Sequence, residues 1–264
     1  MTLLATEGLT KKFGGLTAVA DLDFRVESGS ITSLIGPNGA GKTTVFNVIT
    51  GVYKADGGSI SFVGSDITNM KQHAIAAMGI GRTFQNLRLF APLTALENVV
   101  SGQHTRSHAG VFGSIVGTPA QRREEREVYA VAERCLRQMG LFEQRDVVAG
   151  GMAHGDQRRL EIARALALEP KLLVLDEPAA GLNPNETEEL VRLVRKIRDQ
   201  GITVLLIEHD MGLVMEIADH VTVLENGRKI GEGTPAEVQS NERVIEAYLG
   251  VDDEEDFEPA EAVA

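Results

Sequence analysis

The chain has 264 residues, of which 43% are apolar and 24% charged, and its formal net charge is −12. This composition is typical of a globular protein with a full core, and no uncharged apolar run approaches the roughly 20 residues that a membrane-spanning helix needs. The acidic balance argues against a broad nucleic-acid surface, and the single cysteine, Cys135, excludes an internal disulfide.

Short strand patterns dominate the N-terminal quarter of the chain, and glycine and serine separate them. The patterns predict strands over 3–10, 22–28, 31–36 and 59–64, and helices from Lys42 onward and over 70–78. This part of the chain is therefore expected to form mainly β-structure, with one helix directly after the third strand.

A phosphate-binding pattern lies between that third strand and that helix. Gly36 is followed, after four residues, by Gly41, Lys42 and Thr43. Glycines let such a loop wrap so that successive N–H groups converge on a phosphate, while the lysine reaches the β and γ oxygens and the hydroxyl can bind Mg²⁺. Because a strand precedes the loop and a helix follows it, the pattern predicts a nucleotide site.

The character of the chain changes to helical from about residue 86. This block includes "GMAHGDQRRLEIARAL", residues 151–166, where Gly155 precedes an amphipathic helix pattern. A glycine-rich turn that opens a helix presents free N–H groups and the positive end of the helix dipole, which suits an anion. The pattern indicates a second anion-binding helix end and leaves open which phosphate it meets.

Strands and helices alternate regularly in the C-terminal half. A helix over 156–168 leads to the strand "KLLVLD" at 171–176, and a helix over 184–200 leads to the strand "ITVLLIE" at 202–208. Asn183 and Glu186 form a capping-box pattern at the start of the 184–200 helix. The continuous apolar runs indicate strands covered on both faces, and the alternation predicts an α/β chain with a mainly parallel central sheet.

Polar residues that suit phosphoryl transfer follow three of the expected strands. Asp176 ends one strand and can hold Mg²⁺, and Glu177 can orient or deprotonate the attacking water. His209 follows the next strand and can donate to a γ-phosphate. Gln85 follows a short strand, from which its amide could reach Mg²⁺ or the water.

This order of motifs resembles the nucleotide-binding subunits of ATP-binding cassette (ABC) transporters, over about residues 3–250. The resemblance implies a P-loop cassette with an N-terminal antiparallel β subdomain, an inserted α-helical subdomain, and ATP and Mg²⁺ as cofactors. It assigns Glu177 as catalytic base, His209 as switch histidine, and Thr43, Gln85 and Asp176 as metal ligands. It assigns ATP binding to Phe13, Gly36, Pro37, Asn38, Gly39, Ala40, Gly41, Lys42, Thr43 and Thr44.

The resemblance also implies a use for the second helix end. In that family two cassettes pair head to tail, and the signature residues of one close over the γ-phosphate held by the other. The signature position falls on Ala153, His154, Gly155 and Asp156. Ala153 replaces the usual serine, so one hydroxyl donor is missing, at a cost of about 0.5–1.5 kcal/mol.

Finer resemblance points to the larger ATPase subunit of branched-chain amino-acid importers. It rests on the segments "RTFQNLRLF", "LDEPAAGLNPNETEEL" and "LLIEHDMGLVMEIADHVTVLENGRKIGEGTP". It implies pairing with an identical or sister cassette, and contact with membrane permease subunits, for which Arg88, Leu89 and Phe90 are candidates. It further implies indirect work with a solute-binding protein, at the cytoplasmic face of the membrane. Amide or urea importers and lipopolysaccharide exporters remain alternatives, as does a cassette ATPase acting on nucleic acid or ribosomes, which the charge disfavours.

The expected organisation is one cassette domain over 1–250, with the helical insertion over about 86–168. Residues 251–264 contain seven acidic and no basic residues, which is more than half of the net charge. Such a composition cannot bury a core, so this tail is expected to be disordered. The N-terminal segment has no basic stretch ahead of an apolar one, so no secretory signal is expected.

Overall fold

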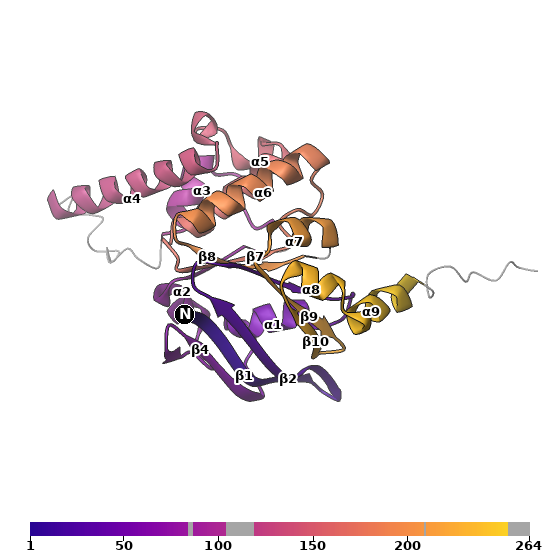
Figure 1. Ribbon diagram of the computed structural model, residues 1–264. Coiled ribbons are helices and arrows are strands. Elements are labelled where there is room, and N and C mark those ends of the chain that lie inside the picture. The colour runs from indigo at the N-terminus through magenta and orange to yellow at the C-terminus, as the bar shows by residue number, and fades with distance from the viewer. Residues whose placement is uncertain (84–86, 104–118, 209, 253–264) are drawn as a thin grey trace, which may run out of the picture.

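The computed structural model describes residues 1–83, 87–103, 119–208 and 210–252. Figure 1 shows two β-sheets and a block of helices, with the larger sheet between the smaller sheet and the helical block. The smaller sheet is antiparallel, in the order β2-β1-β4-β5. Its strands are β1 (Thr2–Phe13), β2 (Leu16–Glu27), β4 (Gly57–Phe62) and β5 (Ser65–Asp66). The expected N-terminal antiparallel subdomain is confirmed.

The larger sheet has the order β10-β9-β3-β8-β7-β6 and is parallel except for β10, which pairs antiparallel with β9. Every residue of its central strands β3, β7 and β8 is buried, which explains the continuous apolar runs of β7 and β8. The strands are β3 (Ile31–Ile35), β6 (Ile80–Arg82), β7 (Leu172–Asp176), β8 (Thr203–Ile207), β9 (His220–Glu225) and β10 (Arg228–Gly233).

Helix α1 (Lys42–Ile49) lies between the two sheets. Its Phe46 and Ile49 belong to one buried apolar cluster with Phe24 of the small sheet and Leu205 of the large sheet. The cluster fixes the start of α1 against both sheets, so the loop that precedes α1 has a rigid support on each side. Helix α2 (Gln72–Met78) completes this half of the molecule.

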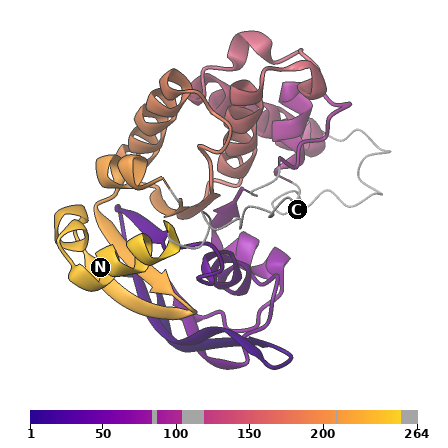
Figure 2. The same cartoon turned by 90° about the vertical axis from the view of Figure 1, so that its right-hand side faces the viewer.

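The helical block covers the opposite face of the large sheet, as Figures 1 and 2 show. Its core joins the sheet residues Leu173 and Leu206 to apolar residues of the helices. Between β6 and β7 in the chain are α3 (Ala95–Ser101), α4 (Pro119–Gln138) and α5 (His154–Leu166), all within the expected range of 86–168. In the described residues no helix is both long and apolar enough to cross a membrane.

Helix α6 (Pro184–Asp199) begins as its sequence predicts. The side chain of Asn183 accepts a hydrogen bond from the N–H of Glu186, and the Glu186 carboxylate accepts one from the N–H of Asn183. This reciprocal pair satisfies two N–H groups that the helix leaves free. The loop before α6 is therefore fixed where it follows β7.

The C-terminal part holds elements that the sequence did not predict. They are α7 (Met211–Ile217), α8 (Pro235–Gln239) and α9 (Glu242–Asp252), in addition to β9 and β10. Val214, Val223, Val238 and Val244 form a third apolar cluster that holds them together. Helix α9 continues two residues past the expected domain end at 250, and residues 253–264 lie outside the described part of the chain.

Candidate functional site

The phosphate loop occupies residues 36–41, between buried strand β3 and helix α1. Gly36 and Gly41 have φ angles of 148° and 101°, which side-chain-bearing residues rarely adopt. A Cβ at Gly36 would lie 2.1 Å from the carbonyl oxygen of Leu224, and one at Gly41 would lie 2.4 Å from that of Ala18. Both glycines are thus required by close packing of backbone on backbone.

The N-terminus of α1 is left open for an anion. Gly41 is its N-cap, no side chain caps it, and its first turn contains no acidic residue. The free N–H groups and the helix dipole therefore present positive potential at the loop. Such an end is suited to a phosphate group.

Lys42 extends over the same loop. Its Nζ donates hydrogen bonds to the carbonyl oxygens of Gly36, at 2.5 Å, and Pro37, at 2.9 Å. Burial lowers the pKa of Lys42, while the negative charge of Glu177 acts in the opposite direction. The ammonium group is therefore held by the loop's own carbonyls, at the place where phosphate oxygens are expected.

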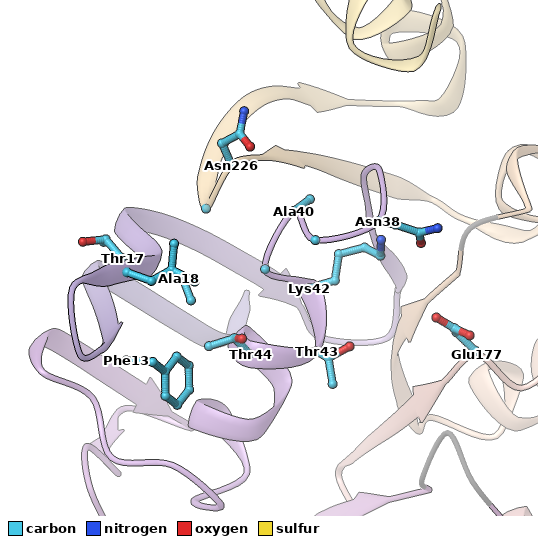
Figure 3. Close-up of a pocket in the computed structure, with 14 residues that line it drawn as sticks. Phe13, Thr17, Ala18, Asn38, Ala40, Lys42, Thr43, Thr44, Glu177 and Asn226 are labelled. Carbon is cyan, nitrogen blue, oxygen red and sulfur yellow. The ribbon is translucent and has the colours of Figure 1, made fainter. Parts of the chain in front are cut away.

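A pocket of about 480 Å³ opens in front of the loop. Figure 3 shows Glu177 across the pocket from Lys42 and Thr43, and Phe13 at the other end, beside Thr44. The full lining is Phe13, Leu16, Thr17, Ala18, Asn38, Gly39, Ala40, Gly41, Lys42, Thr43, Thr44, Glu177, Asn226 and Gly227. The structure therefore brings together the phosphate loop, the predicted aromatic residue and the predicted base.

The Phe13 ring is partly free. It is 42% exposed, meets the ring of Tyr53 edge-on with centroids 5.2 Å apart, and has the Lys11 ammonium 5.2 Å from its centroid. A half-exposed aromatic ring at the mouth of a polar pocket can stack on a flat base. Its position suits the expected adenine contact, which stays a prediction.

Glu177 follows β7 with an unusual backbone. Its φ is 45°, in the left-handed region, and its N–H donates to the carbonyl oxygen of Ile207 at 3.0 Å. A residue other than glycine in this region is uncommon and is often found at functional sites. The turn directs the chain so that Glu177 lines the pocket whereas Asp176, one residue earlier, is buried.

The Asp176 carboxylate has one engaged oxygen and one that is not. Its Oδ2 pairs with the guanidinium of Arg82 at 3.1 Å, whereas its Oδ1 is buried and has no hydrogen-bond partner among the described residues. Burial raises the pKa of Asp176, and the Arg82 charge opposes that effect. An unpartnered buried carboxylate oxygen is costly unless a cation binds it, so Asp176 fits the expected Mg²⁺ ligand.

Two predicted residues lie outside the described part of the chain, namely Gln85 and His209. The residues next to His209 are described. Glu208 is buried and its Oε1 accepts a hydrogen bond from the N–H of Ala179 at 3.0 Å, and the side chain of Asp210 caps α7. The chain on either side of His209 is therefore anchored, and its own role stays a prediction.

The signature residues lie at the N-terminus of α5 and do not line the pocket. Ala153 is the N-cap, and its side chain makes no capping hydrogen bond. Asp156 accepts hydrogen bonds from Gln144 at 2.9 Å and from Arg159. The His154 ring packs against Gly181, since a Cβ there would lie 3.1 Å from its Cε1. Ala153 and His154 are exposed, whereas Gly155 is buried close to the Glu186 side chain. The expected contact of this helix end with another cassette's ATP stays a prediction.

Residues 88–90 lie against α5. Arg164 donates to the carbonyl oxygen of Arg88 and its guanidinium lies 5.8 Å from the centroid of the Phe90 ring. Leu89 packs on the core, while Phe90 is 53% exposed. Of the three residues expected to face membrane subunits, Phe90 thus has the most free apolar surface.

Sequence reasoning missed several residues of the site. Asn226 and Gly227 form the turn between β9 and β10 and line the pocket, and the N–H of Gly227 donates to the carbonyl oxygen of Ala40 at 3.0 Å. The Asn-Gly pair between two strand patterns is a hairpin signal that could have located the turn. Nothing local in the sequence indicates that it would reach the phosphate loop.

Comparison with known proteins gives consistent matches. Residues 19–180 match the family model described as ABC transporter, and residues 228–254 match that of branched-chain amino acid ATP-binding cassette transporters. The high-affinity branched-chain amino acid transport ATP-binding protein BraF of Pseudomonas aeruginosa is 49% identical over 94% of this chain and 98% of its own. The corresponding protein LivG of Escherichia coli K12 is 47% identical over the same shares.

A solved structure is similar over nearly the whole chain. It is the ADP conformation of MJ1267, an ATP-binding cassette of an ABC transporter. It is 36% identical, covers 95% of this chain and 99% of its own, and superposes with a TM-score of 0.83. The similarity extends to both sheets and the helical block.

Proposed function

The chain belongs to the ABC transporter family as an ATP-binding subunit, and on that premise we propose that it hydrolyses ATP to drive import of branched-chain amino acids. The observation that carries the proposal is the pocket that joins the phosphate loop to Glu177. Relatives named for branched-chain amino acid transport, 47–49% identical over almost their full length, support the substrate class.

ATP binding would exchange contacts within the phosphate loop. Its β- and γ-phosphates would accept hydrogen bonds from the free N–H groups at the start of α1, and Lys42 would transfer its Nζ from the two loop carbonyls to phosphate oxygens. The adenine would lie toward Phe13. The loop keeps its shape during this exchange because neighbouring backbone packs against its glycines.

Hydrolysis would begin at Glu177, which faces Lys42 and Thr43 across the pocket. Its carboxylate would orient the attacking water and accept its proton. Thr43 and Asp176 are the described residues that would hold Mg²⁺, and a bound Mg²⁺ would neutralise charge on the phosphates. Gln85 and His209 are proposed, from the order of motifs, to contact the metal and the γ-phosphate.

A second cassette would complete the site. None of the residues that line the pocket belongs to Ala153–Asp156, which lie at the uncapped start of α5. Two copies, or this chain and a sister cassette, placed head to tail would bring each such end to the other's γ-phosphate. The uncapped N–H groups of α5 would then find acceptors.

Permease subunits would contact the cassette beside residues 88–90, with the exposed Phe90 as an apolar anchor. A solute-binding protein would act through those permeases, so this subunit would work at the cytoplasmic face of the membrane. The cassette would never touch the amino acid itself.

The test is reconstitution with the permease subunits and solute-binding protein that co-purify with this chain. Vesicles should take up radiolabelled leucine only with ATP on the cassette side, and should not take up urea. Glu177→Gln should keep ATP binding but lower turnover by about 10²–10⁴-fold, because the general base is lost. ATP-driven uptake of urea without leucine would overturn the substrate class, and normal turnover of the variant would overturn the assigned base.

A further inference from the structure

Arg82, at the end of β6, makes more polar contacts than its place outside the known motifs would suggest. Its Nη1 donates to Asn47 Oδ1 at 2.8 Å and to Thr50 Oγ1 at 2.7 Å, and its Nη2 donates to Asp176 Oδ2 at 3.1 Å. Its Nε donates to the carbonyl oxygen of Thr83 at 3.2 Å. The side chain is 10% exposed, so these contacts are made in a largely dry environment.

These contacts connect two elements that the nucleotide site depends on. Asn47 and Thr50 lie on α1 and at its end, four and seven residues after Thr43, so all three lie on one face of the helix. Asp176 ends β7 on the large sheet. The Arg82 guanidinium therefore contacts both α1, which carries the expected metal ligand Thr43, and Asp176, which is the other expected ligand.

The same contacts determine which oxygen of Asp176 is available. The pair with Arg82 takes Oδ2, and the N–H of Asp176 donates to the Thr83 hydroxyl at 3.3 Å, which fixes the backbone at this point. Oδ1 is the oxygen that remains, and it is buried without a hydrogen-bond partner in the part of the chain that the structure describes. Because a guanidinium presents its donors in fixed directions, the bonds of Nη1 to Asn47 and Thr50 also fix the position of Nη2 on Oδ2, which an ammonium group cannot do equally well.

We propose that Arg82 is a positioning residue for the metal site, which orients Asp176 Oδ1 and holds it in register with Thr43 so that both can serve one divalent cation. The proposal rests on the proposed binding of Mg²⁺ and ATP in this pocket. Partners that orient a metal ligand typically contribute about 10–100-fold to metal affinity.

Two effects of Arg82 on a divalent cation oppose each other, and they make the proposal testable. As a positive charge, Arg82 repels the cation, so charge alone would make removal of Arg82 strengthen Mg²⁺ binding. As a planar guanidinium that orients a metal ligand, Arg82 strengthens binding of the cation. Arg82→Lys keeps the positive charge but removes the guanidinium geometry, and Arg82→Met removes both.

The experiment measures Mg²⁺-dependent binding of a fluorescent, non-hydrolysable ATP analogue to the full chain. For both Arg82→Lys and Arg82→Met, the half-saturating Mg²⁺ concentration should rise by about tenfold, while analogue affinity in EDTA should change by less than about twofold. Asn47→Ala removes one anchor and keeps the Arg82–Asp176 pair, so it should give a smaller rise in the same direction. If Arg82→Met does not fold, Asn47→Ala provides the test in its place.

Arg198→Lys is the matched control, because Arg198 also pairs with a carboxylate, that of Asp219, at the end of α6. It should leave the half-saturating Mg²⁺ concentration unchanged. An unchanged or lowered value in both Arg82 variants would overturn the proposal, as would equal loss of affinity with Mg²⁺ and in EDTA. If the unsubstituted chain binds the analogue equally well with and without Mg²⁺, the failure lies instead in the proposed metal site.

Discussion

The N-termini of α1 and α5 are both expected to meet phosphate, and they are built differently from those of α3, α6 and α8. Helices α3, α6 and α8 each begin with a complete capping box. Neither α1 nor α5 has a side-chain cap. The start of α2 also lacks a side-chain cap, so an uncapped end does not by itself mark a ligand site. At α1 and α5 the sequence in addition predicts a phosphate that would satisfy the free N–H groups.

The two uncapped ends differ in what surrounds them. At α1 a glycine loop, a lysine and a pocket of about 480 Å³ converge on one place. At α5 the N-cap residue Ala153 is exposed, and the first turn contains Asp156, whose charge Arg159 balances. A helix end with a wrapped loop can bind phosphate within one chain, whereas an open end needs a second surface.

The largest effect is expected when the Lys42 ammonium group is removed from the α1 end. Lys42→Ala should weaken ATP binding by about 100-fold, because a charge-assisted contact to phosphate is lost. Lys229→Ala, which removes a lysine paired with Glu232 on β10, is the control and should leave affinity unchanged. Isothermal titration with ATP on the separate chain measures both. Equal affinities would mean that the loop binds phosphate without Lys42.

A smaller effect is expected at the α5 end, where Ala153→Ser adds a hydroxyl. Ala153 has the extended backbone of an N-cap residue, so serine should cap α5 by about 1 kcal/mol and raise the melting temperature by about 2–4 °C without nucleotide. Calorimetry of the two proteins measures this gain.

The same substitution should tighten ATP-dependent dimerisation by up to about tenfold, because the hydroxyl can also donate to a γ-phosphate. Light scattering in the Glu177→Gln background measures it, in ATP and then in ADP, where no change is expected. Ala153→Val, which adds bulk without a hydroxyl, should give neither gain. A higher melting temperature with unchanged dimerisation would assign residue 153 to capping alone.

The smallest effect is expected from removing residues 253–264, which belong to neither helix end. This segment contains six acidic and no basic residues, so it is not expected to contribute to a core. ATPase rate and melting temperature should stay within error of the full chain. A drop of several degrees would show that the segment docks on the folded part.

The sequence predicted most of what is local. The phosphate loop, the buried strand before Asp176 and the capping box of α6 each depend on residues within a few positions of one another, so their patterns are complete in one segment. The C-terminal elements α7, β9, β10, α8 and α9 were not predicted. Their helices are short or weakly patterned, and they are stabilised by a shared apolar cluster that forms only in the folded chain.

Long-range contacts of the site could not be predicted from one sequence. The pair between Arg82 and Asp176 joins residues 94 positions apart, and its other anchors on α1 are 32 and 35 positions away from Arg82. No periodicity or motif spacing encodes such a pairing. The same holds for the packing of His154 on Gly181, which depends on how α5 and the loop before α6 meet.

The turn at Asn226 and Gly227 has a consequence for how the protein is made. The phosphate loop contacts this turn, which lies almost 190 residues later, and Gly227 in turn accepts a hydrogen bond from the N–H of Ala20. Contacts between distant segments form late, so during synthesis the nucleotide site cannot be completed until the β9–β10 hairpin has left the ribosome. Released chains that end before residue 220 should therefore fail to bind ATP although every phosphate-loop residue is present, and filter binding of such truncations would show it.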